Sequence, residues 1–214
     1  MEESQIFFRP WKGKDYANSK IDGKRVLVLG HTYPCNEKNL TKVCDTCGVK
    51  PLKKYCRSVT TKSINEYRHG KLKIRHANTF RAFEKALIGN ECSDIWDSLI
   101  FYNYVQKAFV NPDGRTGKCP MDYYRRSFEP LVNVLLKYQP KYVIVWGKPN
   151  HDFVIKLFKD NGYKVESFNE GNDFVYEKVT IGVLQIYFLR MQHPSMEFKP
   201  DFWHEKIELF LNLD

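Results

Sequence analysis

Hydrophobic runs of the sequence end in polar side chains that can move protons or form directional hydrogen bonds. These residues are His31, Thr32 and Tyr33 after the run 25–30, Asn103 at the end of 98–103 with Gln106 beyond it, and Gln192, His193 and Ser195 after 184–191. The set is mostly neutral and offers donors and acceptors, which suits reading the edge of a planar heterocycle. The neighbouring aromatic residues Phe101 and Tyr104 could stack on such a ring. Taken singly, each residue could also be an ordinary loop residue or a strand cap, as Asn103 would be at the start of a turn.

The same runs predict the strands that would bring these residues together. Predicted strands cover 25–30, 98–103, 142–147 and 184–191. Two of them carry Val and Ile at consecutive positions, which is typical of strands buried on both faces of a parallel sheet. Helical spacing of apolar residues predicts helices over 79–88, 121–138, 151–161 and 202–211, and 164–186 contains further β-like pieces that suit an edge hairpin.

Alternation of strands and helices predicts an α/β fold: a three-layer sandwich with a four-stranded, mainly parallel central sheet flanked by helices. Ligands of such sheets bind beyond the carboxyl ends of the strands, so the candidate residues are expected on one edge. The chain of 214 residues suits one domain, 1–214, with a basic, cysteine-rich insertion at about 35–75. Two small domains divided near residue 90 are the less favoured arrangement.

Charge is concentrated in one segment of the chain. Residues 38–75 hold eleven basic and two acidic residues, which accounts for the whole formal net charge of +9. A solvated lysine-rich loop is one interpretation, and a loop that binds a polyanion such as DNA is the favoured one. Within it we expect Lys53, Lys54 and Arg57 to contact phosphates.

The sequence gives no sign of membrane insertion or export. No apolar run approaches the length of a membrane-spanning helix, and the first residues lack the apolar core of a secretion signal. We therefore expect a cytoplasmic protein whose cysteines are reduced thiols or metal ligands.

Four of the six cysteines predict a metal site in the basic segment. Cys35, Cys44, Cys47 and Cys56 follow the spacing C-x8-C-x2-C-x8-C. The central C-x2-C pair is a frequent half of a tetrahedral zinc site, and zinc is the default metal because it can close a loop that has no core of its own. His31 or His76 could replace one ligand, and chance clustering of reduced thiols is the other interpretation. The remaining thiols, Cys92 and Cys119, are expected to be ordinary ones.

In order and spacing, the stretches VLVLGHTYPC, SLIFYN and MQHPS resemble the uracil-DNA glycosylase superfamily, with YVIVWGKP as the intervening strand and helix start. The resemblance extends from about residue 25 to the end, apart from the basic insertion. It implies a DNA glycosylase that hydrolyses the N-glycosidic bond of uracil or a modified base flipped out of DNA. Some branches of this superfamily hold a 4Fe-4S cluster on four cysteines, which makes that cluster the alternative to zinc.

The resemblance also implies roles for single residues. Asn103 would read the extruded base, with Tyr33, Phe101 and Tyr104 beside it. His193 would stabilise negative charge on the leaving base, and the loop after the first strand, with His31 and Thr32, would hold the water-activating or sugar-facing residue. Pro194 and Ser195 would pinch the DNA backbone, and Met196 would begin an apolar wedge into the duplex.

The first loop departs from the family pattern. It reads GHTYPC, with no carboxylate and with its proline one position later than in the family. Either His31 activates the water, or Asp94 or Asp97 does so, or the site binds without cleaving. The alternatives to a glycosylase are therefore a non-catalytic nucleic-acid-binding module on the same fold and a small-molecule enzyme such as a nucleoside hydrolase. Neither a phosphate-cradling glycine loop nor a serine-centred elbow is present.

Overall fold

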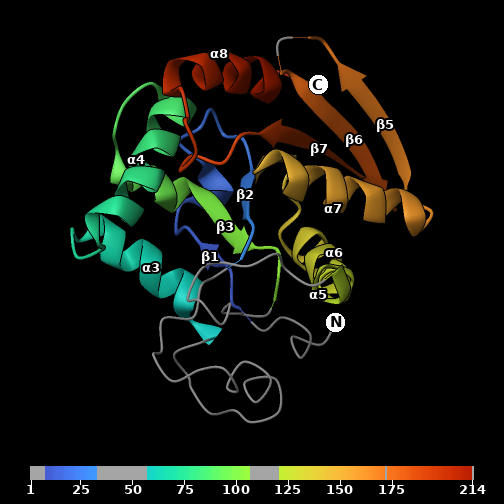
Figure 1. Ribbon diagram of the computed structural model, residues 1–214, viewed down its shortest axis with the longest axis horizontal. Coiled ribbons are helices and arrows are strands. Elements are labelled where there is room, and N and C mark those ends of the chain that lie inside the picture. The colour runs from blue at the N-terminus through green and yellow to red at the C-terminus, as the bar shows by residue number, and fades with distance from the viewer. Residues whose placement is uncertain (1–7, 33–56, 107–120, 172, 214) are drawn as a thin grey trace.

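The computed structural model describes residues 8–32, 57–106, 121–171 and 173–213, and these residues form one sheet with helices on both faces (Figure 1). The strands are β1 (Trp11–Lys12), β2 (Val26–Gly30), β3 (Leu99–Asn103), β4 (Tyr142–Trp146), β5 (Lys164–Asn169), β6 (Val175–Ile181) and β7 (Leu184–Met191). The helices are η2 (Tyr16–Asn18), α3 (Val59–Arg68), α4 (Ile74–Ile88), η3 (Ser93–Ser98), α5 (Met121–Arg126), α6 (Phe128–Tyr138), α7 (Lys148–Asp160) and α8 (Pro200–Leu211).

The expectation of a four-stranded, mainly parallel sheet is wrong. Within the described residues the sheet has seven strands in the order β1-β3-β2-β4-β7-β6-β5. The strands β3, β2, β4 and β7 pair in parallel, whereas β1, β6 and β5 each pair antiparallel with a neighbour, so the sheet is mixed. The difference arises because the chain after α7 folds into the antiparallel hairpin β5–β6, which continues the sheet beyond β7. The expectation of a hairpin in 164–186 is confirmed.

Each face of the sheet carries its own apolar cluster. Successive residues of a strand point to opposite faces, so alternate residues of β2 enter different clusters. Val26 and Val28 pack with side chains of α4 and α8, and Leu27 and Leu29 pack with side chains of α6 and α7. All five residues of β2 are buried, as expected for a strand covered on both faces.

Two helices differ from the expectation. The helix expected over 121–138 is divided into α5 and α6 at Ser127, whose hydroxyl donates to the carbonyl of Tyr123 and accepts from the backbone N–H of Gln106. Helix α3 was not expected, because its sequence lies in the basic segment that suggested a loop. It buries Ile64 and Tyr67 in the same apolar cluster as α4 and α8, so part of that segment belongs to the core of the fold.

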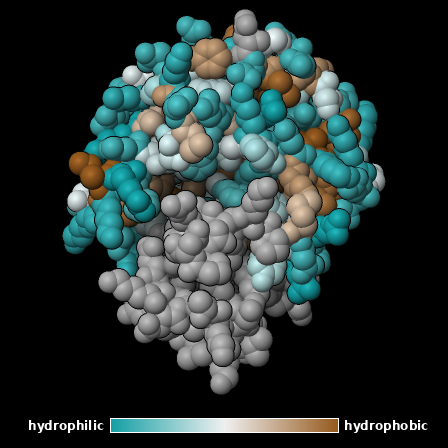
Figure 2. All heavy atoms as spheres, viewed as in Figure 1, coloured by the Kyte–Doolittle hydropathy of each residue, from teal (hydrophilic) through white to brown (hydrophobic). Residues whose placement is uncertain are grey.

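The visible surface is mostly polar. In the view of Figure 2, hydrophilic side chains predominate and hydrophobic ones lie as separate spots. Large apolar residues that are well exposed include Ile74, Val183 and Leu209. None of the helices in the described parts of the chain combines the length and apolarity needed to cross a membrane.

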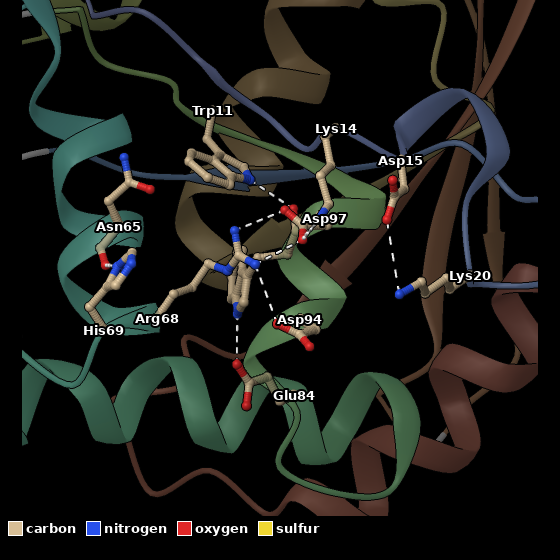
Figure 3. A network of polar contacts seen from close by, with 11 residues as sticks. Trp11, Lys14, Asp15, Lys20, Asn65, Arg68, His69, Glu84, Asp94 and Asp97 are labelled. Carbon is tan, nitrogen blue, oxygen red and sulfur yellow. Dashed lines mark hydrogen bonds and ion pairs between the residues drawn. The ribbon is translucent and has the colours of Figure 1, made fainter.

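A buried ion pair fixes the C-terminal end of α3 (Figure 3). The guanidinium of Arg68 donates to both carboxylate oxygens of Asp97, with Nη1–Oδ1 at 2.9 Å and Nη2–Oδ2 at 2.8 Å. The Asp97 side chain is only 5% exposed, and Lys14 lies 3.4 Å away on its other side. Arg68 also lies over the Trp11 ring, whose Nε1–H donates to the carbonyl of Trp96. The network therefore ties α3 to β1 and to η3.

We predict that Arg68→Met lowers the free energy of unfolding by about 2–4 kcal/mol, because it leaves the Asp97 carboxylate buried without its bidentate partner. Arg81→Met is the matched control, since Arg81 pairs with Glu91 while both side chains are more than 40% exposed. It should cost less than about 1 kcal/mol. Urea unfolding of both variants measures the difference, and equal losses would contradict the assignment.

Candidate functional site

The carboxyl ends of β2 and β3 place two of the predicted residues side by side. Gly30, the last residue of β2, is the ladder partner of Asn103, the last residue of β3. Parallel pairing continues past the strand ends, where the backbone N–H of Val105 donates to the carbonyl of His31 at 2.9 Å. The register therefore brings His31 next to Asn103 on this edge of the sheet, which we call the carboxyl edge.

Gly30 is the residue that makes space for the Asn103 amide. A Cβ at position 30 would lie 2.6 Å from Asn103 Oδ1, too close for any larger residue without a shift. Asn103 itself is only 4% exposed. Its Nδ2 donates to Thr60 Oγ1 at 3.3 Å, and its backbone carbonyl accepts from Gln106 Nε2 at 2.6 Å. The amide is thus held in a fixed place at the strand end.

His193 lies on the same edge in the loop after β7. Its ring meets the Trp146 ring edge to face, with centroids 5.6 Å apart. The backbone N–H of Ser195 donates to His193 Nδ1 at 3.2 Å, and Ser195 Oγ lies 2.8 Å from the same atom. Since Nδ1 accepts, the neutral ring carries its proton on Nε2. That N–H is the donor that a ligand would meet.

Burial keeps both histidines of the site neutral near pH 7. Burial, with a smaller contribution from the charge that His31 carries when protonated, lowers the pKa of His193 to about 4. Burial likewise lowers the pKa of His31, whose Nε2 contacts the hydroxyl of Tyr124 on α5. His31 follows β2 and His193 follows β7, so both lie at the carboxyl ends of strands that β4 joins by parallel pairing. The site is polar and uncharged at these two rings.

The two aromatic residues expected to stack on a base lie in the core. Tyr104 is fully buried, and its hydroxyl donates to the carbonyl of Tyr124 at 2.7 Å. Phe101 is 6% exposed and packs edge-on against Trp96 and close to Trp146. In this arrangement a base has no access to the Tyr104 ring. Both rings support the strand that carries Asn103.

The acids considered for water activation lie at the wrong end of β3. Asp94 and Asp97 belong to η3, which precedes the strand, whereas Asn103 ends it. Both carboxylates also contact Arg68. They therefore cannot reach a water near His193, and this expectation is wrong. Of the groups that we considered for this role, His31 is at the carboxyl edge.

The loop after His193 presents an apolar side chain to solvent. Pro194 is buried, whereas Ser195 and Met196 are exposed, Met196 at 62%. The loop is held by the backbone N–H of Met196, which donates to the His193 carbonyl, and by Gln192 Nε2, which donates to the Met196 carbonyl. A closed turn with an exposed Met at its tip is compatible with the wedge expected from the sequence.

Several predicted residues lie outside the part of the chain that the structure describes. They are Tyr33, Cys35, Cys44, Cys47, Lys53, Lys54 and Cys56. The zinc or 4Fe-4S site therefore stays a prediction, and among the described residues no group of three or more His, Cys, Asp or Glu is placed to hold a metal ion. Thr32 follows His31, is half-buried and has polar partners. Arg57 is exposed, and its carbonyl accepts from the backbone N–H of Arg9 at 2.8 Å.

Sequence analysis missed two residues of the site, Tyr124, which contacts His31, and Thr60. Its position in the basic segment gave no reason to place it beside Asn103, 43 residues away along the chain. The helical periodicity of 59–68, with Thr60, Ser63, Ile64 and Tyr67 on one buried face, is the signal that could have indicated α3.

No protein-family model matches the chain, and no curated protein matches it in sequence. The resemblance to the uracil-DNA glycosylase superfamily therefore stays a prediction.

We predict that the His193 ring titrates near pH 4 rather than near its ordinary value of 6.5. A histidine whose pKa is lowered by folding binds fewer protons than in the unfolded chain, so stability falls as the pH drops from about 6.5 toward 4. Nuclear magnetic resonance of the ring protons measures the midpoint, and His31→Asn should move it upward because a neighbouring charge is removed. A midpoint at or above 6.5 would show that burial does not control this ring.

Proposed function

We propose that the protein is a DNA glycosylase that hydrolyses the N-glycosidic bond of uracil or a modified base flipped out of DNA. The observation that carries the proposal is that one sheet edge holds both a buried Asn103 amide and a neutral His193, whose Nδ1 accepts from the Ser195 N–H so that the ring proton lies on Nε2. An amide can read the hydrogen-bonding edge of a base, and a neutral imidazole can donate to a base oxygen.

The chemistry follows from the electron balance of the reaction. When the bond between sugar C1′ and the base nitrogen breaks, its electron pair stays on the base, and negative charge develops on the ring oxygens. His193 would stabilise that charge by donating a hydrogen bond from the Nε2–H of its neutral ring, the form that its lowered pKa favours near pH 7. Water adds to C1′, and neutral His31 is the group that we propose to accept the proton from it.

DNA binding is proposed for the basic segment. Arg57 lies three residues before Thr60, which contacts Asn103, so this arginine precedes the end of α3 that lies at the carboxyl edge. Lysine and arginine side chains beside the site would neutralise phosphates without reading the sequence.

A specific observation favours a second candidate, the non-catalytic nucleic-acid-binding module. The described part of the first loop offers His31 and Thr32 and no carboxylate, and His31 already contacts Tyr124. If His31 cannot accept the proton from water, base recognition would persist without cleavage.

The test uses single-stranded and duplex DNA that carries one uracil or modified base, followed by alkaline cleavage at abasic sites. We predict strand breaks at that base, and a fall of about 10²–10³ in rate for His193→Asn because it removes the donor to the leaving base. Asn103→Ala should lower the cleavage rate more than it lowers the affinity for DNA. The matched control is His69→Asn, which changes an exposed histidine at the other end of α3 and should leave the rate unchanged.

If every DNA stays intact while gel-shift binding persists, the glycosylase proposal fails and the binding module stands. If neither cleavage nor binding is seen, both fail.

We predict that replacing Lys53, Lys54 and Arg57 together by Gln weakens DNA binding and makes it less dependent on salt. Each phosphate contact that is lost should reduce the slope of log K against log salt by about 0.9 for duplex DNA, so the slope falls by about 2–3. The same change at Lys156, Lys159 and Lys164, three exposed lysines away from the carboxyl edge, is the control. Equal effects of the two triple variants would remove the basic segment from the interface.

A further inference from the structure

His151 is a buried histidine that takes no part in the proposed reaction. It belongs to the first turn of α7, and its side chain is 1% exposed. Each ring nitrogen faces a carboxylate: Nδ1 lies 3.2 Å from Asp152 Oδ1, and Nε2 lies 2.7 Å from Glu177 Oε2. Glu177 comes from β6, and its side chain is only 9% exposed. The contact therefore joins the start of α7 to β6 in the interior of the protein.

The other charged groups around His151 come from the same region of the fold. Arg190 on β7 binds Asp152 through two hydrogen bonds, of 2.8 Å and 3.1 Å. Lys148, also in the first turn of α7, pairs with Asp173, two residues before β6, at 2.6 Å. Strand β4 has no charged residue, and the charged residues of β5 point to the face of the sheet away from α7. The protonation of His151 is therefore governed by the two carboxylates that its ring meets.

The chemistry of these groups fixes the number of protons that they hold. Asp152 is ionised, because hydrogen bonds from His151 and Arg190 lower its pKa to about 2, so the ring donates to it from Nδ1. A second proton must lie between Nε2 and Glu177 Oε2, since a bare nitrogen lone pair would otherwise face a carboxylate oxygen at 2.7 Å. This count holds whichever of the two atoms carries the proton. Burial by itself lowers the pKa of His151, but the two carboxylates outweigh burial and raise this pKa above 6.5.

Loss of the second proton removes the attraction between α7 and β6 at this point. A neutral nitrogen and a charged carboxylate, both acceptors, then face each other away from water. An ionised group that is buried without a partner is unfavourable, so water must enter or the two segments must separate. The pair of Lys148 with Asp173 does not use this proton, and its side chains are 31% and 48% exposed. It holds the segments near each other while the buried contact opens.

We propose that His151 and Glu177 form a pH-sensitive latch, which is closed while a proton lies between them and opens when alkaline conditions remove it. The latch holds the start of α7 on β6. It lies next to the carboxyl edge, because Gly147, immediately before α7, donates its N–H to the carbonyl of Met191, two residues before His193. The latch is a property of the fold and does not depend on the proposed function.

The sign of the effect on stability follows from the raised pKa. A histidine whose pKa is raised by folding contributes stability that is complete below the unfolded value of about 6.5. This stability is lost as the pH rises through the folded pKa. The latch therefore weakens the protein on the alkaline side, opposite to the effect of His193.

The test replaces Glu177 by Gln, whose amide can donate to the neutral Nε2 and so closes the contact without the proton. Glu166→Gln is the matched control, because Glu166 is a carboxylate of the same hairpin that pairs with Lys164 at the surface. The melting temperature of each protein is measured near pH 6 and near pH 9. Relative to the wild type, Glu177→Gln should be about 2–4 °C more stable near pH 9 than near pH 6. Glu166→Gln should show no such dependence, and a constant difference between Glu177→Gln and the wild type would overturn the proposal.

A second measurement needs only the wild-type protein. Nuclear magnetic resonance of the His151 ring gives its midpoint, which should lie above 6.5, and Glu177→Gln should lower it. The backbone N–H signals of β6 and of the first turn of α7 should shift with the same midpoint, because both segments respond when the latch opens. A wild-type midpoint at or below 6.5 would overturn the proposal. Backbone signals that stay unchanged while the ring titrates would overturn it as well.

Discussion

The parallel pairing of β2 with β3 and β4 is the constraint on which the site depends. It forces three strands to end at the same edge, and burial of β2 on both faces leaves it no freedom to slip, because a shift of one residue would exchange the two apolar clusters. Asn103 and His31 are neighbours as a result of this register. Apolar packing in the two core clusters therefore sets the positions of the polar side chains at the carboxyl edge.

The two faces of the sheet contribute differently to the site. Helix α3 supports Asn103 from one face through Thr60, and α5 contacts His31 from the other through Tyr124. The loop after β7 then supplies His193. The backbone N–H of Ser195 in the same loop donates to His193 Nδ1, so the ring proton lies on Nε2. Three separate supports thus hold three side chains.

Local periodicity was enough to predict most elements, and strand direction was enough to predict that Asn103 and His193 share an edge. The mixed sheet could not be predicted, because β1 has only two residues and the direction in which a hairpin joins a sheet leaves no local pattern. Helix α3 was hidden by its charged residues. Asp94 and Asp97 were expected near the carboxyl edge, but they precede β3 in the chain. Residues that precede a strand lie at its amino end. Thr60 could not be found, since a contact across 43 residues has no signature in the chain.

Both edge strands of the sheet are poor templates for the addition of another strand. The terminal strand β1 offers two residues for pairing, and β5 at the opposite margin is largely exposed and carries an ion pair of Lys164 with Glu166. Unpaired backbone on a long apolar margin would invite another chain to add a strand, whereas a very short or charged margin disfavours it. The antiparallel hairpin that enlarges the sheet thus also limits its growth, and protects the folded chain against edge-to-edge aggregation.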